Sequence, residues 1–231
     1  GRYAHVAEFF CGHGFSFMTF DLRGHGKSSG LRGHVDDFDI YNDDVDNLIQ
    51  EANRRHPQLP VFLYGHSLGG NIVLNYSLSR KPQIKGVISS SPFLGLAYDP
   101  GFKLIIGKTL YSLLPKFSMA NGLDRNGLSR DVDVVERYNK DPLVHDMVSA
   151  RLGLDLINSG KWIIEHAREF PLPLLLMQGS ADWIVSSDAT REFAAKLPAG
   201  LITYKEWEGG YHELHNDIIK EDVLQTMQAW R

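Results

Sequence analysis

Short apolar segments alternate along the chain with longer segments of helical periodicity. The apolar segments span residues 15–20, 61–64, 84–89, 172–177 and 201–204. Several of them are apolar at nearly every position, which is typical of strands buried on both faces of a sheet. The helical segments span residues 39–55, 67–79, 188–197 and 218–230. This alternation predicts an α/β fold in which helices flank a mostly parallel sheet on both faces.

One long segment interrupts the alternation. Residues 99–169 contain no clear strand, but they carry many apolar side chains at helical spacing: Phe102, Leu104, Ile105, Ile106, Leu110, Leu113 and Leu114. A segment of about seventy residues is too long for a connecting loop. We therefore expect a helical cap at residues 99–169, inserted after the third predicted strand into a core formed by residues 1–98 and 170–231.

Composition and charge exclude several classes of protein. The 231 residues include 24 basic and 28 acidic side chains, and this net charge of −4 favours neither a nucleic-acid partner nor a basic patch for anionic lipid. No apolar run approaches the roughly 18 residues of a membrane-spanning helix. The single Cys11 can form neither an intramolecular disulfide nor a cysteine-based zinc site, and we expect it to be buried near the end of a short helix. We expect a cytoplasmic protein.

The segment Gly65-His66-Ser67-Leu68-Gly69 follows a predicted strand directly and opens a helical segment. A strand, a sharp turn and a helix together are the context of a nucleophile elbow. The glycines allow the tight bend, and the serine hydroxyl is left exposed at the helix N-terminus, where the helix dipole favours developing negative charge. We predict that Ser67 is a nucleophile.

Three other motifs imitate sites without the context that those sites need. Gly26-Lys27-Ser28-Ser29-Gly30 has the same spacing as the elbow, but it leads into no helix. Its Gly-Lys-Ser would end a phosphate-binding loop, yet Asp21 stands where that loop needs a glycine. His212 and His215 suggest zinc, but the helical zinc motif needs its second histidine one position later, at Asn216. We expect neither a nucleotide site nor a metal ion.

A serine nucleophile needs a general base, and ten histidines compete for that role. Five of them precede the elbow, against the chain order of this architecture. His212 follows Gly209 and Gly210 after the last predicted strand, where an open parallel sheet places its site. We predict His212 as the base, with His66 packed beside the site and His215 at the surface.

The base in turn needs a carboxylate to orient it. Asp182 follows the strand at residues 172–177 and a predicted turn at residues 178–181, so it also stands at a carboxyl end of the sheet. The rival Asp188 begins a helical segment, which is typical of a helix cap. We predict Asp182 as the orienting acid.

With these motifs in place, the sequence resembles the monoacylglycerol lipase and lysophospholipase branch of the α/β-hydrolase family. Matching segments run through the chain: Gly1-Arg2-Tyr3, Asp21 to Ser28, Gly33-His34-Val35, Gly65 to Gly70, Leu128-Ser129-Arg130, Asp141 to Val144, Gln178 to Asp182 and Gly210 to His215. The resemblance implies an α/β-hydrolase fold whose helical cap follows the strand after the nucleophile helix and covers an acyl-chain tunnel. It gives Ser67, Asp182 and His212 the roles of nucleophile, acid and base. It makes the backbone N–H of Leu68 an oxyanion donor, and it implies no cofactor.

The same resemblance places three strands and a His-Gly oxyanion loop before Gly1. We therefore expect the core to be N-terminally truncated, with one encoded oxyanion donor and without the other. A catalytically impaired fragment or a binding scaffold is the alternative that this expectation raises.

The expected reaction is hydrolysis of a carboxylic ester of a lipid, a monoacylglycerol or a lysophospholipid, through an acyl-enzyme. The apolar cap residues favour a fatty acyl chain, and an exposed apolar cap surface would allow peripheral contact with a membrane. Two alternatives stay open: the apolar stripe is only the interior of the cap, or the same triad hydrolyses another ester, a thioester or an aminoacyl amide. The sequence carries no signal for acyl length, head group or oligomeric state.

Overall fold

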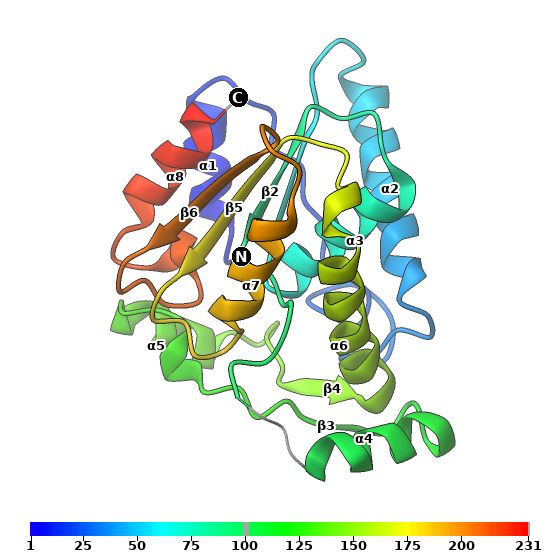
Figure 1. The fold of residues 1–231 in the computed structure, drawn as a ribbon. Helices are drawn as coiled ribbons and strands as arrows, with labels where there is room; N and C mark the ends of the chain where they lie inside the picture. The colour runs from blue at the N-terminus through cyan, green and yellow to red at the C-terminus, as the bar shows by residue number, and fades with distance from the viewer. Residues whose placement is uncertain (99–101, 231) are drawn as a thin grey trace.

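Four of the five predicted strands pair into one parallel sheet in a computed structural model, which describes residues 1–98 and 102–230. The strands are β1 (Phe62–His66), β2 (Gly86–Ser90), β5 (Leu174–Gly179) and β6 (Ile202–Trp207), and they pair in the order β1-β2-β5-β6. Each pairing is parallel, and the arrows of β5 and β6 point the same way in Figure 1. Their carboxyl ends therefore meet at one edge of the sheet.

Helices cover both faces of this sheet, which explains why its strands are apolar at consecutive positions. Leu174 and Leu176 pack in a hydrophobic cluster with residues of α2 (Asp39–Arg55), α3 (Leu68–Arg80), α6 (Ala150–Glu165) and α7 (Ser187–Lys196). Leu175 and Met177, which point to the opposite face, pack with α1 (Ala4–Gly12) and α8 (Lys220–Ala229). The predicted fold class, a mostly parallel sheet flanked by helices, is confirmed.

The strand predicted at residues 15–20 is wrong. No strand of the described part of the chain pairs with this segment, and the backbone N–H of Phe15 bonds instead to the carbonyl of Phe10, 3.1 Å away in α1. Phe15 and Phe17 pack against the cluster of α1 and α8. The apolar pattern here therefore serves side-chain packing, because a strand also needs a neighbour to complete its hydrogen-bond ladder.

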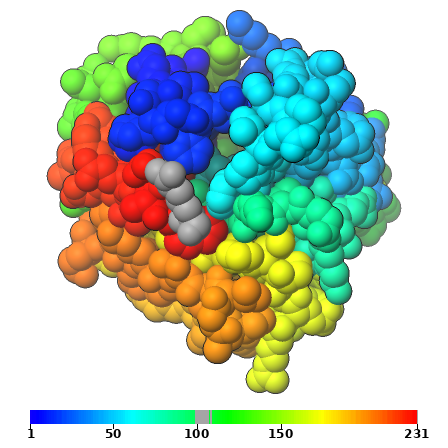
Figure 2. Space-filling model, turned by 90° about the horizontal axis from the view of Figure 1, so that it is seen from above, coloured from blue at the N-terminus to red at the C-terminus, as the bar shows by residue number. Residues whose placement is uncertain are grey.

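Helix α1 leaves Cys11 exposed, so the prediction that this cysteine is buried is wrong. The buried residues of the helix are Val6 and Phe10, spaced four apart on one face, and Cys11 lies off that face. Figure 2 shows α1 in blue between the red α8 and the cyan end of α2, seen from the end of the molecule away from the strand tips.

The predicted cap region holds helices α4 (Phe102–Leu113) and α5 (Val132–Lys140), but the expectation that it lacks strands is wrong. β3 (Ser118–Ala120) pairs antiparallel with β4 (Met147–Ser149). Strands of three residues are too short to show as an alternating pattern in sequence. In Figure 1 these elements lie together beyond the carboxyl ends of the sheet strands.

The last helix of the region, α6, packs as part of the core. Its Leu152 and Ile163 are buried in the cluster formed by α3 and the sheet. Residues 99–169 as one cap therefore stay a proposal, and the structure favours a smaller cap that ends at β4. The predicted first residue of the cap, Asp99, and the side chains of Phe102, Leu104, Ile105 and Ile106 lie outside the described residues.

Candidate active site

Ser67 lies in the sharp turn between β1 and α3. Its φ of 55° and ψ of −116° are a backbone conformation that non-glycine residues rarely adopt, at a typical cost of about 1–3 kcal/mol. The turn also brings two backbones into contact, because a Cβ added to Gly65 would lie 2.1 Å from the carbonyl oxygen of Gly69. The surrounding contacts and hydrogen bonds hold the serine in this strained conformation at the carboxyl edge of the sheet.

Hydrogen bonds from the neighbouring strand fix the backbone of this turn. The N–H of Ser67 donates to the carbonyl of Ser90 over 3.1 Å. The carbonyl of Ser67 accepts from the N–H of Asn71 at 2.9 Å and of Phe93 at 3.1 Å. Leu68 begins α3 directly after the serine, so its N–H lies at a helix N-terminus.

The structure brings together the three side chains that the sequence selects for the triad. His212 Nε2 lies 2.9 Å from Ser67 Oγ, and His212 Nδ1 lies 2.8 Å from Asp182 Oδ2. Asp182 follows β5 and His212 follows β6, so each side chain comes from the end of a different strand. The arrangement can pass a proton from the serine hydroxyl to the imidazole while the carboxylate holds the Nδ1–H.

Both oxygens of Asp182 are fully engaged. Oδ1 accepts the backbone N–H groups of Ile184 at 2.9 Å and Val185 at 3.2 Å. Oδ2 accepts from His212 and also from Gln178 Nε2 at 3.0 Å. The carboxylate is buried, and these four donors take the place of water around its oxygens.

The rival residues lie elsewhere. Ser28 donates its hydroxyl to the carbonyl of Asp21 within an exposed turn. Asp188 does not cap α7, because the cap is Ser186, whose Oγ accepts the N–H of Ala189 at 3.1 Å. Asp188 instead pairs with Arg191 in the first turn of the helix, so the prediction of a capping role for it is wrong.

Two further histidines surround the triad. His66 packs beside His212, with ring centroids 4.7 Å apart, as predicted. His215 is buried with only 1% of its surface exposed, so the predicted surface position is wrong. It stacks on Tyr3 and its Nδ1 lies 3.3 Å from the Tyr64 hydroxyl, because the loop turns inward under α1.

Burial keeps both of these histidines neutral. It lowers the pKa of His66 well below the usual value, and the nearby His212, His215 and Arg2 lower it further. Burial also lowers the pKa of His215 well below the usual value, helped by His5, Arg2 and His212. The cluster therefore presents uncharged rings beside the triad.

Ion pairs fix the loop that carries His212. Arg2 forms a salt bridge with Glu213, the residue after the base. Arg130 Nε lies 2.8 Å from Oδ1 of Asp217, whose side chain is completely buried. In addition, the backbone N–H of His212 donates to the carbonyl of Gly127 over 3.1 Å. The cap-region segment around residues 127–130 thus supports the catalytic loop.

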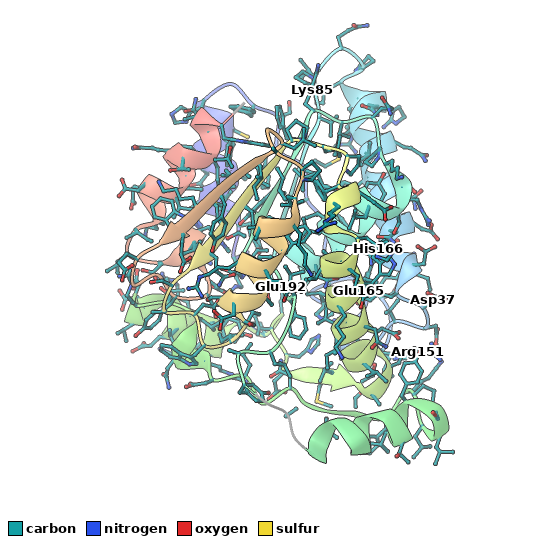
Figure 3. The ribbon with its side chains drawn as sticks, in the orientation of Figure 1. Asp37, Lys85, Arg151, Glu165, His166 and Glu192 are labelled. Atoms are coloured by element: carbon teal, nitrogen blue, oxygen red, sulfur yellow. The ribbon has the colours of Figure 1, made fainter. Side chains whose placement is uncertain are left out.

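Two surface cavities, of about 310 and 230 Å³, are lined by other residues than the triad. The larger one lies beside α6, and Asp37 and Arg151, which line it, are labelled in Figure 3 above α4. The smaller one is lined by Arg2 and Tyr138, among others.

Gln178 is a site residue that the sequence prediction missed. Residues 178–181 were expected to form a turn, whereas β5 continues to Gly179 and Gln178 is buried within it. The available signal was a polar side chain at the end of an otherwise apolar strand, because buried polar groups are hydrogen-bonded.

Across residues 1–98 and 102–230, no group of three or more His, Cys, Asp or Glu side chains could hold a metal ion. None of the helices in that same part of the chain is long and apolar enough to span a membrane.

Known proteins match this chain over all or nearly all of its length. The family described as serine aminopeptidase, S33, matches residues 1–219. A Dictyostelium discoideum relative, described as an uncharacterized abhydrolase domain-containing protein, is 35% identical over the whole chain, which covers 24% of that relative. Phospholipase YtpA of Bacillus subtilis (strain 168) is 34% identical, with 100% of this chain and 89% of the relative covered. The crystal structure of Paleococcus ferrophilus monoacylglycerol lipase is 36% identical with a TM-score of 0.92, covering 100% of this chain and 88% of that one.

Proposed function

The chain belongs to the serine aminopeptidase S33 family of α/β-hydrolases, and on that premise we propose that it cleaves a monoacylglycerol or a lysophospholipid through an acyl-enzyme. It is a carboxylic ester hydrolase that acts on lipid esters. The observation that carries the proposal is the hydrogen-bonded series Ser67–His212–Asp182 at the strained turn after β1.

The geometry supports a two-step reaction. His212 Nε2 accepts the proton of the Ser67 hydroxyl as Oγ attacks the ester carbonyl, and it then gives that proton to the departing alcohol. In the second step His212 removes a proton from water, which attacks the acyl group, and it returns that proton to Ser67 Oγ as the acyl–oxygen bond breaks and the fatty acid is released. Asp182 stays ionised throughout and stabilises the imidazolium that forms in each step.

The N–H of Leu68 serves as an oxyanion donor in this scheme. It lies at the N-terminus of α3, immediately after the nucleophile, where the helix dipole favours negative charge. One such donor is worth about 10²–10³ in turnover.

A fluorophosphonate probe tests the nucleophile. It should form a covalent adduct on Ser67, detected by peptide mass, and Ser67→Ala should abolish labelling and lower kcat by roughly 10⁴–10⁶. Ser28→Ala, in the motif with the same spacing, is the matched control and should label normally. Labelling that survives Ser67→Ala would refute the assignment.

Substrate class is tested by comparing kcat/KM on four compounds, of which the monoacylglycerol and the lysophospholipid carry the same acyl chain. We expect turnover of a monoacylglycerol or a lysophosphatidylcholine to exceed that of a short p-nitrophenyl ester and of an aminoacyl amide. The opposite order would replace the lipid assignment with a general esterase or a peptidase.

We also propose peripheral contact with a membrane through the cap. Leu113, Leu114 and Met119 are 73%, 57% and 48% exposed and lie within seven residues of the chain, in the cap region beyond the strand tips. Transfer of exposed apolar side chains from water into a lipid interface is favourable, because it lowers their free energy. The double variant Leu113→Ser, Leu114→Ser should reduce sedimentation with phosphatidylcholine vesicles.

The control is Leu59→Ser, which removes a leucine that is 53% exposed in the connection between α2 and β1, away from the cap. It should bind vesicles like the parent chain. Equal loss in both variants would show that the contact is not specific to the cap.

A further inference from the structure

We propose that Gln178 and Thr190 form a positioning pair that sets the orientation of the Asp182 carboxylate and, through it, of His212. The inference rests on the reaction proposed above, in which Asp182 holds the base. Neither residue touches the reacting atoms.

The pair forms a continuous hydrogen-bonded path from helix α7 to the triad. Thr190 Oγ1 donates to Gln178 Oε1 over 3.0 Å. Gln178 Nε2 donates to Asp182 Oδ2 over 3.0 Å, the same oxygen that accepts Nδ1 of His212 at 2.8 Å. Both side chains of the pair belong to residues with no exposed surface.

Neighbouring oxygens fix which way the glutamine amide points. Its Nε2 faces Asp182 Oδ2 and also the carbonyl of Gly179, 3.4 Å away. If the amide were reversed, Oε1 would face two oxygen acceptors in a buried site without a proton between them. The amide must therefore present Nε2 to Asp182 and leave Oε1 for Thr190.

Thr190 determines how firmly that orientation is held. Its hydroxyl can also donate to the carbonyl of Ser186, 3.3 Å away, but the bond to Gln178 is shorter. Without the hydroxyl, Gln178 Oε1 would be a buried acceptor with no donor, and the amide could rotate away from Asp182.

The pair has two effects on the base. It keeps Oδ2 where the Nδ1–H of His212 can reach it. The hydrogen bond from Gln178 Nε2 also stabilises the negative charge on that oxygen. A carboxylate that loses this donor attracts the imidazolium more strongly, so the neutral form of the base would persist only at higher pH. Loss of the pair should therefore lower kcat and also move the acid limb of the pH–rate profile upward.

Two substitutions test this in the full chain. Gln178→Leu removes the donor with little change in volume, and Thr190→Val removes only the hydroxyl that holds it. We expect kcat to fall about five- to tenfold in Thr190→Val, the loss that one neutral hydrogen bond represents, and about tenfold or more in Gln178→Leu, which removes a bond to a charged carboxylate, with KM unchanged in both. The acid limb should move to higher pH in both, and further in Gln178→Leu.

Thr190→Ser is the matched control, because it keeps the hydroxyl and should restore the parent kcat and pH profile. The end-point fraction labelled by a fluorophosphonate should equal that of the parent in every variant, while the labelling rate falls with kcat. A merely structural role would lower the labelled fraction and leave the acid limb in place, and this result would overturn the proposal. If the parent chain itself is not labelled at Ser67, the proposed reaction fails instead.

Discussion

Gly65 and Gly69 both flank the nucleophile, but their surroundings differ. A Cβ on Gly65 would overlap the carbonyl of Gly69, whereas a Cβ on Gly69 would meet no atom within 4 Å. Gly65→Ala should therefore lower the free energy of unfolding by about 1–3 kcal/mol and reduce kcat by displacing Ser67. Gly69→Ala lies in helix α3 and should raise that free energy by about 0.4–1 kcal/mol.

Urea denaturation of both variants measures the two changes. The opposite signs make the pair informative, since the substitutions are chemically identical. Destabilisation by Gly69→Ala as large as that of Gly65→Ala would contradict the geometry of the turn.

Single site residues could be predicted from the sequence where they follow the end of a predicted strand. Ser67, Asp182 and His212 could be selected together because each follows a strand of one parallel sheet. Burial of His215 could not be predicted, because it depends on the ring of Tyr3, more than two hundred residues earlier in the chain. The role of Gln178 could not be predicted either, because it depends on a hydrogen bond between strand β5 and Thr190 of helix α7.

Between elements, the ion pair of Arg130 with Asp217 supports the loop after β6. Arg130 is the only described cation within 4 Å of the carboxylate of Asp217, which is fully buried and also accepts the backbone N–H of Ile218. Removing one member of a buried pair leaves an uncompensated charge, so Arg130→Met should cost about 3 kcal/mol of unfolding free energy. Because the loop carries His212, kcat should fall as well.

Arg125→Met is the comparison for this prediction. Arg125 and Asp146 lie 3.6 Å apart with side chains 40% and 47% exposed, and such surface pairs contribute about 0–1 kcal/mol. Chemical denaturation should therefore separate the two variants by about 2 kcal/mol or more. Similar losses would mean that Asp217 finds another partner.

Elements with a long, regular pattern could be predicted with nearly correct ends, and short or unpaired ones could not. α2 has the predicted bounds, because its apolar stripe continues over four turns. The segment at residues 15–20 has the composition of a strand, but pairing is a property of two segments. β3 and β4 are too short for periodicity, and their pairing depends on a contact across the cap.

At the scale of the whole molecule, the buried neutral histidines make stability depend on pH. Burial and nearby cations hold the pKa of His66 and His215 well below 6.5 in the folded chain. In the unfolded chain both should titrate near pH 6.5, so the unfolded state binds more protons below that pH. The contribution of the two neutral rings to the free energy of unfolding is fully present above pH 6.5. It is lost as the pH falls from 6.5 toward their pKa values in the folded chain.

The expected slope is about 1.4 kcal/mol of unfolding free energy per pH unit for each histidine, below pH 6.5 and above the folded-state pKa values. Urea denaturation at half-unit steps between pH 7 and pH 5 measures this slope.

His215→Asn removes one titrating group. It should reduce the slope by about 1.4 kcal/mol per pH unit, and it should also lower the free energy of unfolding at pH 7. A slope that is the same in His215→Asn as in the parent would mean that this ring is already protonated in the fold.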